Sequence, residues 1–161
     1  MLPVAANKFI RFFNFLANMG LVLRDDPPRV IDMAGREWGE PADGLALSIR
    51  ELKREDPRQV AGISVVIKNE EPRSRILNVP PWIFFCEIDG LELTPYGRQL
   101  MSPDRKGKNI EVKLDPNGAI ETDLPVATIY NMRGGGEYQV QVSCRLPDQT
   151  VLRSNEITIR V

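Results

Sequence analysis

The chain has 161 residues, with 21 Lys or Arg against 22 Asp or Glu, so its formal net charge at pH 7 is −1. This length predicts one domain plus an appendage, and without a broad basic field we expect no nucleic-acid partner. Histidine is absent, which excludes Ser-His-Asp and Cys-His catalysis as well as histidine-ligated zinc. We therefore expect a noncatalytic protein that needs no cofactor and no metal.

The first 23 residues are unusually rich in phenylalanine, with four of the six in the chain. Polar residues recur between the apolar ones at helical spacing: Asn7, Arg11, Asn14 and Asn18. On a helix they form one narrow stripe and leave a wide apolar face. The sequence predicts an amphipathic helix over residues 1–23 that docks on a membrane interface or in the groove of a partner. Its docking side chains are predicted to be Phe9, Phe12, Phe13, Phe15, Leu16 and Met19.

Three other interpretations of this segment stay open. A signal peptide would use Lys8 and Arg11 as its basic region, but no small-x-small cleavage site follows. A membrane-spanning helix needs about 20 apolar residues, and Asn14 and Asn18 interrupt this run. In the third interpretation the helix packs on the protein's own body.

Residues 24–43 are rich in proline, glycine and charge, and we expect an extended connector. From residue 44 to residue 161, short segments of alternating apolar and polar residues predict an antiparallel β-sandwich. Expected strands cover residues 45–50, 61–68, 76–79, 82–88, 91–96, 110–114, 119–124, 138–146 and 156–161. Asp89-Gly90 predicts a two-residue hairpin turn, and residues 115–118 predict a second hairpin.

The two cysteines, Cys86 and Cys144, each share a strand face with apolar residues. A disulfide across the sandwich would form if both faces point inward and the compartment is oxidising. Two separate buried thiols are the interpretation that we favour, and in a reducing compartment both should titrate as thiols.

Other polar clusters have ordinary explanations that we prefer to functional ones. Residues 134–136 are three glycines, but a strand follows them where a phosphate-binding loop needs a helix. The acids and amide between residues 115 and 123 do not have the spacing of a calcium-binding EF-hand. We expect Trp82 to be a core residue rather than a binding platform.

Residues 136–140, Gly-Glu-Tyr-Gln-Val, resemble the Gly-x-Tyr-x-Val that opens a late strand in immunoglobulin-like and fibronectin III-like domains. The ending at residues 154–159 and the segment at residues 38–45 are similar to the last strand and lead-in of bacterial domains of this kind. The resemblance covers roughly residues 38–161, but Trp82 precedes both cysteines, unlike the Cys-Trp-Cys order of true immunoglobulin domains. It implies an immunoglobulin-like sandwich in which the hydroxyl of Tyr138 fastens a corner.

Together these features predict an extrinsic accessory subunit that stabilises a larger membrane-associated assembly, with energy-transducing assemblies the expected kind. The expected location is peripheral to a membrane, on the cytoplasmic face in preference to the extracytoplasmic one. Two alternatives come from other classes: a secreted ligand- or carbohydrate-binding module, and a sandwich-type protease inhibitor.

Overall fold

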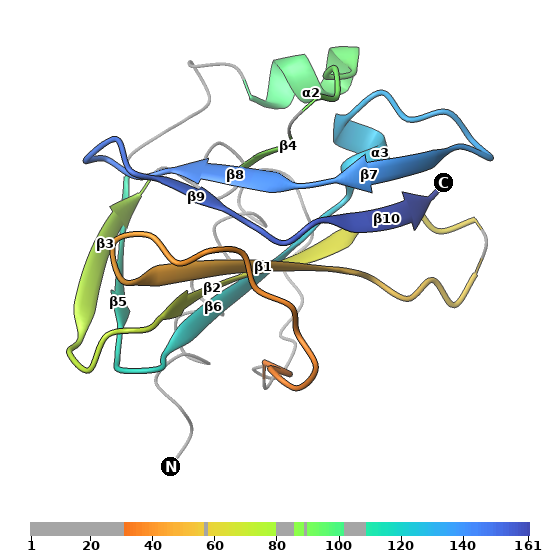
Figure 1. The fold of residues 1–161 in the computed structure, drawn as a ribbon. Helices are drawn as coiled ribbons and strands as arrows, with labels where there is room; N and C mark the ends of the chain where they lie inside the picture. The colour runs from red at the N-terminus through yellow and green to blue at the C-terminus, as the bar shows by residue number, and fades with distance from the viewer. Residues whose placement is uncertain (1–30, 57, 80–85, 89, 102–108) are drawn as a thin grey trace, which may run out of the picture.

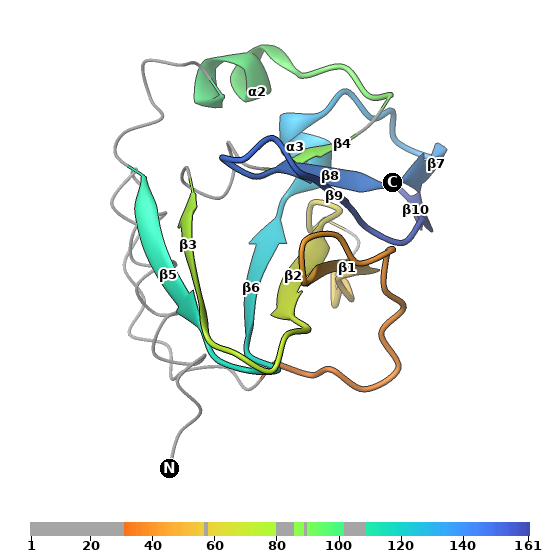
Figure 2. The ribbon, with the colours of Figure 1, turned by 60° about the vertical axis from the view of Figure 1, so that its left-hand side comes forward.

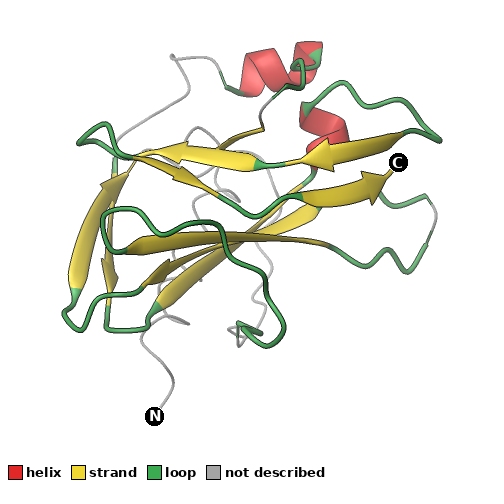
Figure 3. Ribbon diagram, in the orientation of Figure 1, coloured by secondary structure: helices red, strands yellow, loops and turns green. Residues whose placement is uncertain are grey.

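The computed structural model describes residues 31–56, 58–79, 86–88, 90–101 and 109–161. These ranges contain ten β-strands and two short helices (Figures 1 and 3). The elements are β1 (Leu45–Glu51), β2 (Ile63–Asn69), β3 (Arg75–Val79), β4 (Cys86–Ile88), α2 (Pro95–Leu100), β5 (Ile110–Leu114), β6 (Ala119–Leu124), α3 (Val126–Ile129), β7 (Glu137–Val140), β8 (Val142–Arg145), β9 (Val151–Arg153) and β10 (Ile157–Arg160). The N-terminal helix predicted over residues 1–23 lies outside the described residues.

The strands pair in four antiparallel groups, whose orders are β1-β2-β6, β3-β5, β4-β8-β9 and β10-β7. The mostly β, antiparallel architecture predicted from the alternating pattern is therefore confirmed. The four groups are not independent, because β2 leads into β3, β5 into β6, β7 into β8 and β9 into β10. Eight of the ten strands thus form two long ribbons, each of which bends once, while β1 and β4 pair along their edges.

The first ribbon joins β2-β3 to β5-β6 and turns at a corner held by Asn69. At this corner residues 69–74 lie opposite residues 115–118, so the register changes between the two pairs of strands. Asn69 is fully buried. Its Nδ2 donates to the carbonyl of Leu114 at 3.2 Å, and its backbone N–H donates to the carbonyl of Gly118 at 2.9 Å. Figure 2 shows the consequence: β3 and β5 stand at an angle to β2 and β6.

The second ribbon joins β7-β8 to β9-β10 and contains a one-residue bulge. Between the matched pairs Val140–Ile157 and Ser143–Arg153, two residues face three. Such an extra residue bends a strand and redirects its side chains. The bulge presents Asn155 to the free edge of β1, where its Oδ1 accepts from the N–H of Ile49 at 2.8 Å and its Nδ2 donates to the carbonyl of Ile49 at 3.0 Å.

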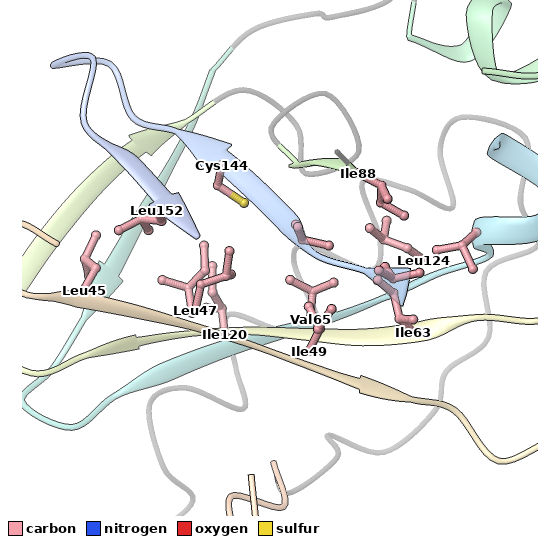
Figure 4. Packing of buried hydrophobic residues seen from close by; sticks show 14 of the residues in the cluster. Leu45, Leu47, Ile49, Ile63, Val65, Ile88, Ile120, Leu124, Cys144 and Leu152 are labelled. Atoms are coloured by element: carbon pink, nitrogen blue, oxygen red, sulfur yellow. The ribbon is translucent and has the colours of Figure 1, made fainter. Parts of the chain in front are cut away.

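The core lies between the β1-β2-β6 sheet and the second ribbon. Figure 4 shows Leu45, Leu47 and Ile49 of β1 gathered with Cys144 and Leu152 of the ribbon. All five of these residues are 0–2% exposed. The opposite face of the same sheet is buried as well, and the buried residues there are Ala46, Ser48, Ser64, Val66 and Ala119. Another segment of the protein must therefore cover this outer face of the sheet.

The hairpin predicted around Asp89-Gly90 is wrong. β4 pairs with β8, and residues 95–100 form α2. Thr94 and Pro95 explain the difference: the Thr94 hydroxyl accepts from the N–H of Gly97 at 2.9 Å, and proline suits the first helical turn because it needs no donor there. A Cβ at Gly97 would lie 2.1 Å from the carbonyl oxygen of Ile129, so the helix packs where only glycine fits.

The second predicted hairpin is also wrong, although both of its strands form. β5 and β6 occupy the expected residues 110–114 and 119–124, but they pair with β3 and β2 instead of with each other. The turn at residues 115–118 is part of the ribbon corner, where Gly118 donates its N–H to the carbonyl of Asp115 at 2.7 Å. A turn signal fixes where the chain reverses but not which strands become neighbours.

We predict that Asn155→Ala lowers the free energy of unfolding by about 2 kcal/mol, because it leaves a donor and an acceptor on the edge of β1 unpaired. Asn155→Asp should lose less, since the carboxylate still accepts from Ile49. Urea unfolding monitored by circular dichroism measures both changes. Gln139→Ala, at an exposed position of β7, is the control and should leave the midpoint unchanged. Equal midpoints for Asn155→Ala and the control would contradict the clamp.

Candidate functional site

A buried arginine, Arg36, lies on the outer face of the β1-β2-β6 sheet, and its side chain is 0% exposed. Its Nη2 donates to the hydroxyl of Ser64 on β2 at 2.7 Å and lies 3.3 Å from Oε1 of Glu121 on β6. The Ser64 hydroxyl in turn donates to the same Glu121 oxygen at 2.5 Å. These three side chains form a closed polar cluster that joins two strands to the segment preceding β1.

A short turn presents Arg36 to the sheet. The N–H of Ala34 donates to Oδ1 of Asp32 at 3.0 Å, and Gly35 follows with φ +67°, which glycine adopts readily. The Nε of Arg36 then donates to the carbonyl of Asp32 at 2.9 Å, which closes the turn. The sequence of this turn therefore determines where the guanidinium enters the sheet.

The residues after Arg36 continue along the edge of β1. The Ser48 hydroxyl donates to the carbonyl of Glu37 at 2.6 Å, and the N–H of Gly39 donates to the carbonyl of Leu47 at 2.9 Å. A Cβ at Gly39 would lie 1.8 Å from the carbonyl oxygen of Arg153, so glycine is required at this crossing. The Lys68 ammonium lies 5.6 Å from the ring centroid of Trp38, a cation–π contact that adds to the cover over the outer face.

The charges in this cluster hold the segment on the sheet and do not serve proton transfer. Burial lowers the pKa of the Arg36 guanidinium, the charge of Arg50 lowers this pKa further, and the carboxylates of Glu121, Asp32 and Asp123 raise it. An arginine nonetheless stays protonated in a protein, so it transfers no proton at ordinary pH. Its Nη1 is buried without a hydrogen-bond partner, which lowers the stability of the folded protein. The cluster therefore holds the segment at residues 32–39 on the sheet.

Tyr138 lies at the start of β7, after the three glycines. Its hydroxyl accepts a hydrogen bond from the N–H of Arg133, five residues upstream, at 2.6 Å. A Cβ at Gly136 would lie 2.7 Å from Cε2 of the tyrosine, so the ring covers this glycine closely. The N–H of Gly135 donates to the carbonyl of Val161, which ties the turn to the end of β10. The bond to Arg133 lies at an exposed position.

The other residues singled out from the sequence are dispersed or engaged elsewhere. The predicted docking residues and Trp82 lie outside the described residues. Asp115 accepts from the Ser74 hydroxyl at 3.0 Å, and Glu121 accepts from Ser64 and Arg36. Among the described residues, no three His, Cys, Asp or Glu side chains are grouped to hold a metal ion.

Three large apolar side chains are exposed in the described ranges: Val60, Ile76 and Tyr96. They belong to the loop before β2, to β3 and to α2, and Figure 1 shows β3 and α2 well apart. Single exposed apolar residues are ordinary on a protein surface. They do not define a docking patch.

Comparisons with protein-family models, with curated proteins and with solved structures found no match to this chain. In the part of the chain that the structure describes, no helix is long and apolar enough to cross a membrane.

Sequence reasoning missed the polar residues that organise the described fold: Arg36, Asn69, Tyr130 and Asn155. Arg36 had one usable signal, since Asp32 and Gly35 are typical of a turn that can fix the residue after it. The two asparagines had none, because each acts on backbone groups that only the folded chain brings near.

We predict that Glu121→Leu lowers the free energy of unfolding by about 3 kcal/mol, because it leaves the Arg36 charge buried without its carboxylate. Arg36→Met combined with Glu121→Leu should recover much of this loss, since replacing both charges removes the penalty. Urea midpoints of the two variants test the pair. A double variant no more stable than the single one would show that the charges are not coupled.

We predict that Tyr138→Phe costs about 0.5–1 kcal/mol, since water can replace the lost hydroxyl at the exposed Arg133 N–H. Gly136→Ala should cost more, because its methyl group displaces the ring itself. Thermal unfolding of both variants checks this order. If Tyr138→Phe were the more damaging change, the hydroxyl and not the ring packing would hold the turn.

Proposed function

We propose that this chain is a noncatalytic, immunoglobulin-like accessory subunit. In this proposal its phenylalanine-rich N-terminal segment docks on a larger membrane-associated protein assembly, which the subunit stabilises. The β body serves as the scaffold.

The strand orders support the immunoglobulin-like part of the proposal. β1-β2-β6 corresponds to strands A-B-E of such domains, and β4-β8-β9 corresponds to strands C-F-G. In this correspondence β7 and β8 together take the place of strand F, which begins with the tyrosine of the corner motif. The hydroxyl of Tyr138 bonds to the backbone a few residues upstream, as that motif requires. The β3-β5 pair would then be an extension of the first sheet beyond the common core.

The concentration of phenylalanine near the N-terminus carries the docking part. Phe9, Phe12, Phe13 and Phe15 fall within one short stretch, together with Leu16 and Met19. Burying each phenylalanine side chain is worth roughly 1.5–3 kcal/mol, so this stretch can supply most of the docking free energy. A fold of this class does not specify an activity, and function is added through loops and appended segments. The appended segment contains four of the six phenylalanine residues of the chain.

We predict that replacing Phe12, Phe13 and Phe15 with serine releases the protein from its membrane-associated assembly and leaves the β body folded. Cell fractionation followed by native gels measures release, and circular dichroism of the purified variant measures folding. Asn14→Ser with Asn18→Ser is the matched control, because it changes the polar stripe of the same segment and should leave docking intact.

The same experiment separates the alternatives. A triple variant that still migrates with the assembly would refute the docking segment. A triple variant that unfolds would assign the segment to the protein's own core. Wild-type protein found as a free monomer in the medium would favour a secreted binding module, and inhibition of added proteases would favour an inhibitor.

A further inference from the structure

β5 is an edge strand, because within the described residues it pairs with β3 on one side only. The pairing runs from Arg75 opposite Leu114 to Val79 opposite Ile110. In Figure 2, β5 is the leftmost strand, with β3 beside it. Among the described residues, no segment forms backbone hydrogen bonds with its other edge. This edge differs from that of β1, which other parts of the chain cover.

The hydrogen bonds at the ribbon corner show which backbone groups of β5 face the free edge. The Nδ2 of Asn69, in the part of the chain that leads into β3, donates to the carbonyl of Leu114 at 3.2 Å, so this carbonyl faces β3. The backbone groups of successive residues face opposite edges of a strand. The N–H and C=O groups of Glu111 and Lys113 therefore face the free edge, whereas those of Val112 face β3.

The side chains of β5 divide between two faces of the sheet. Val112 and Leu114 belong to the core and are 5% and 1% exposed. Glu111 and Lys113 lie on the opposite face and are exposed. The Lys113 ammonium is 3.9 Å from a carboxylate oxygen of Asp115, and an exposed ion pair of this kind contributes little to stability. Both charges therefore remain available to a strand placed against the free edge.

The charges make this edge complementary to itself. When a second copy of β5 lies antiparallel to the first, with the two Val112 residues opposite one another, Glu111 of each copy lies opposite Lys113 of the other. Opposite charges at facing positions stabilise a strand pair, and like charges destabilise it. Sliding the second copy by two residues would face Glu111 with Glu111 or Lys113 with Lys113. A parallel, in-register pair would do both at once.

We propose that the free edge of β5 is a self-association surface, on which a second copy of this chain adds its own β5, antiparallel and centred on Val112. Because Glu111 and Lys113 carry the outward-facing backbone groups, the two charge pairs are also hydrogen-bonded pairs of the new ladder. Each copy uses this edge once, so the symmetric dimer is closed and does not grow into a fibre. A strand of five residues buries little surface, so we expect a weak dimer with a dissociation constant of roughly 100 μM.

Sedimentation equilibrium of the purified full chain tests the dimer at concentrations from about 10 μM to about 1 mM, which bracket the expected dissociation constant. Glu111→Lys and Lys113→Glu each give an edge that carries charges of one sign. Each variant alone should associate at least about tenfold more weakly than wild type, because both facing pairs become repulsive. An equimolar mixture of the two variants should recover wild-type association, because opposite charges then face each other again. Glu137→Lys, at an exposed position of β7, is the matched control and should associate as wild type does.

Amide hydrogen exchange of the wild-type chain locates the contact. The N–H groups of Glu111 and Lys113 should become protected as the concentration rises, whereas that of Val112, which faces β3, should be protected at every concentration. Dimers that form without this change would place the association elsewhere and overturn the proposal. A wild-type chain that stays monomeric at about 1 mM, or a mixture of variants that associates no better than its components, would overturn it as well.

Discussion

Two asparagine side chains hold the two bends on which the whole arrangement of strands depends. Asn69 is buried inside the corner of the first ribbon, and Asn155 reaches from the bulge of the second ribbon to Ile49. Asn69 bonds to peptide groups at the corner itself, whereas Asn155 bonds to the N–H and carbonyl of Ile49 on the edge of β1. An amide side chain offers both N–H donors and a carbonyl acceptor, as peptide groups do, and can therefore take the place of a strand partner. Without these side chains the carbonyl of Leu114 and the N–H and carbonyl of Ile49 would lose these hydrogen bonds.

Several separate hydrogen bonds together cover the edge of β1. An unpaired edge is a hazard for a β protein, because its open backbone groups can recruit another strand. Here Gly39 bonds to Leu47 and Asn155 bonds to Ile49, so the edge is occupied along much of its length. The segment that supplies Gly39 is fixed by the Arg36 cluster on the outer face. The buried charge therefore stabilises a surface that hydrophobic burial alone would leave open.

In the β4-β8-β9 group, a side chain from outside the sheet helps to fix the register of the strands. The hydroxyl of Tyr130, immediately after α3, accepts from the N–H of Ile88. This N–H therefore has its partner on the side of β4 that faces away from β8. This contact and the pairing with β8 fix the register, and the register decides that Cys86 faces Cys144.

The sequence by itself determined the class of the fold and the residue ranges of most strands. Apolar and polar residues alternate along a strand that has one buried and one exposed face. This pattern is local in the sequence, and it predicted the ranges of β5, β6 and β10. The resemblance to immunoglobulin-like domains implied a role for the Tyr138 hydroxyl, and this hydroxyl does bond to the backbone five residues upstream. Tertiary structure alone decided that β4 pairs with β8, that Asn155 serves Ile49, and that Arg36 enters the outer face. These contacts join residues 58, 106 and 85 positions apart, and no local pattern encodes which distant backbone group will be left without a partner.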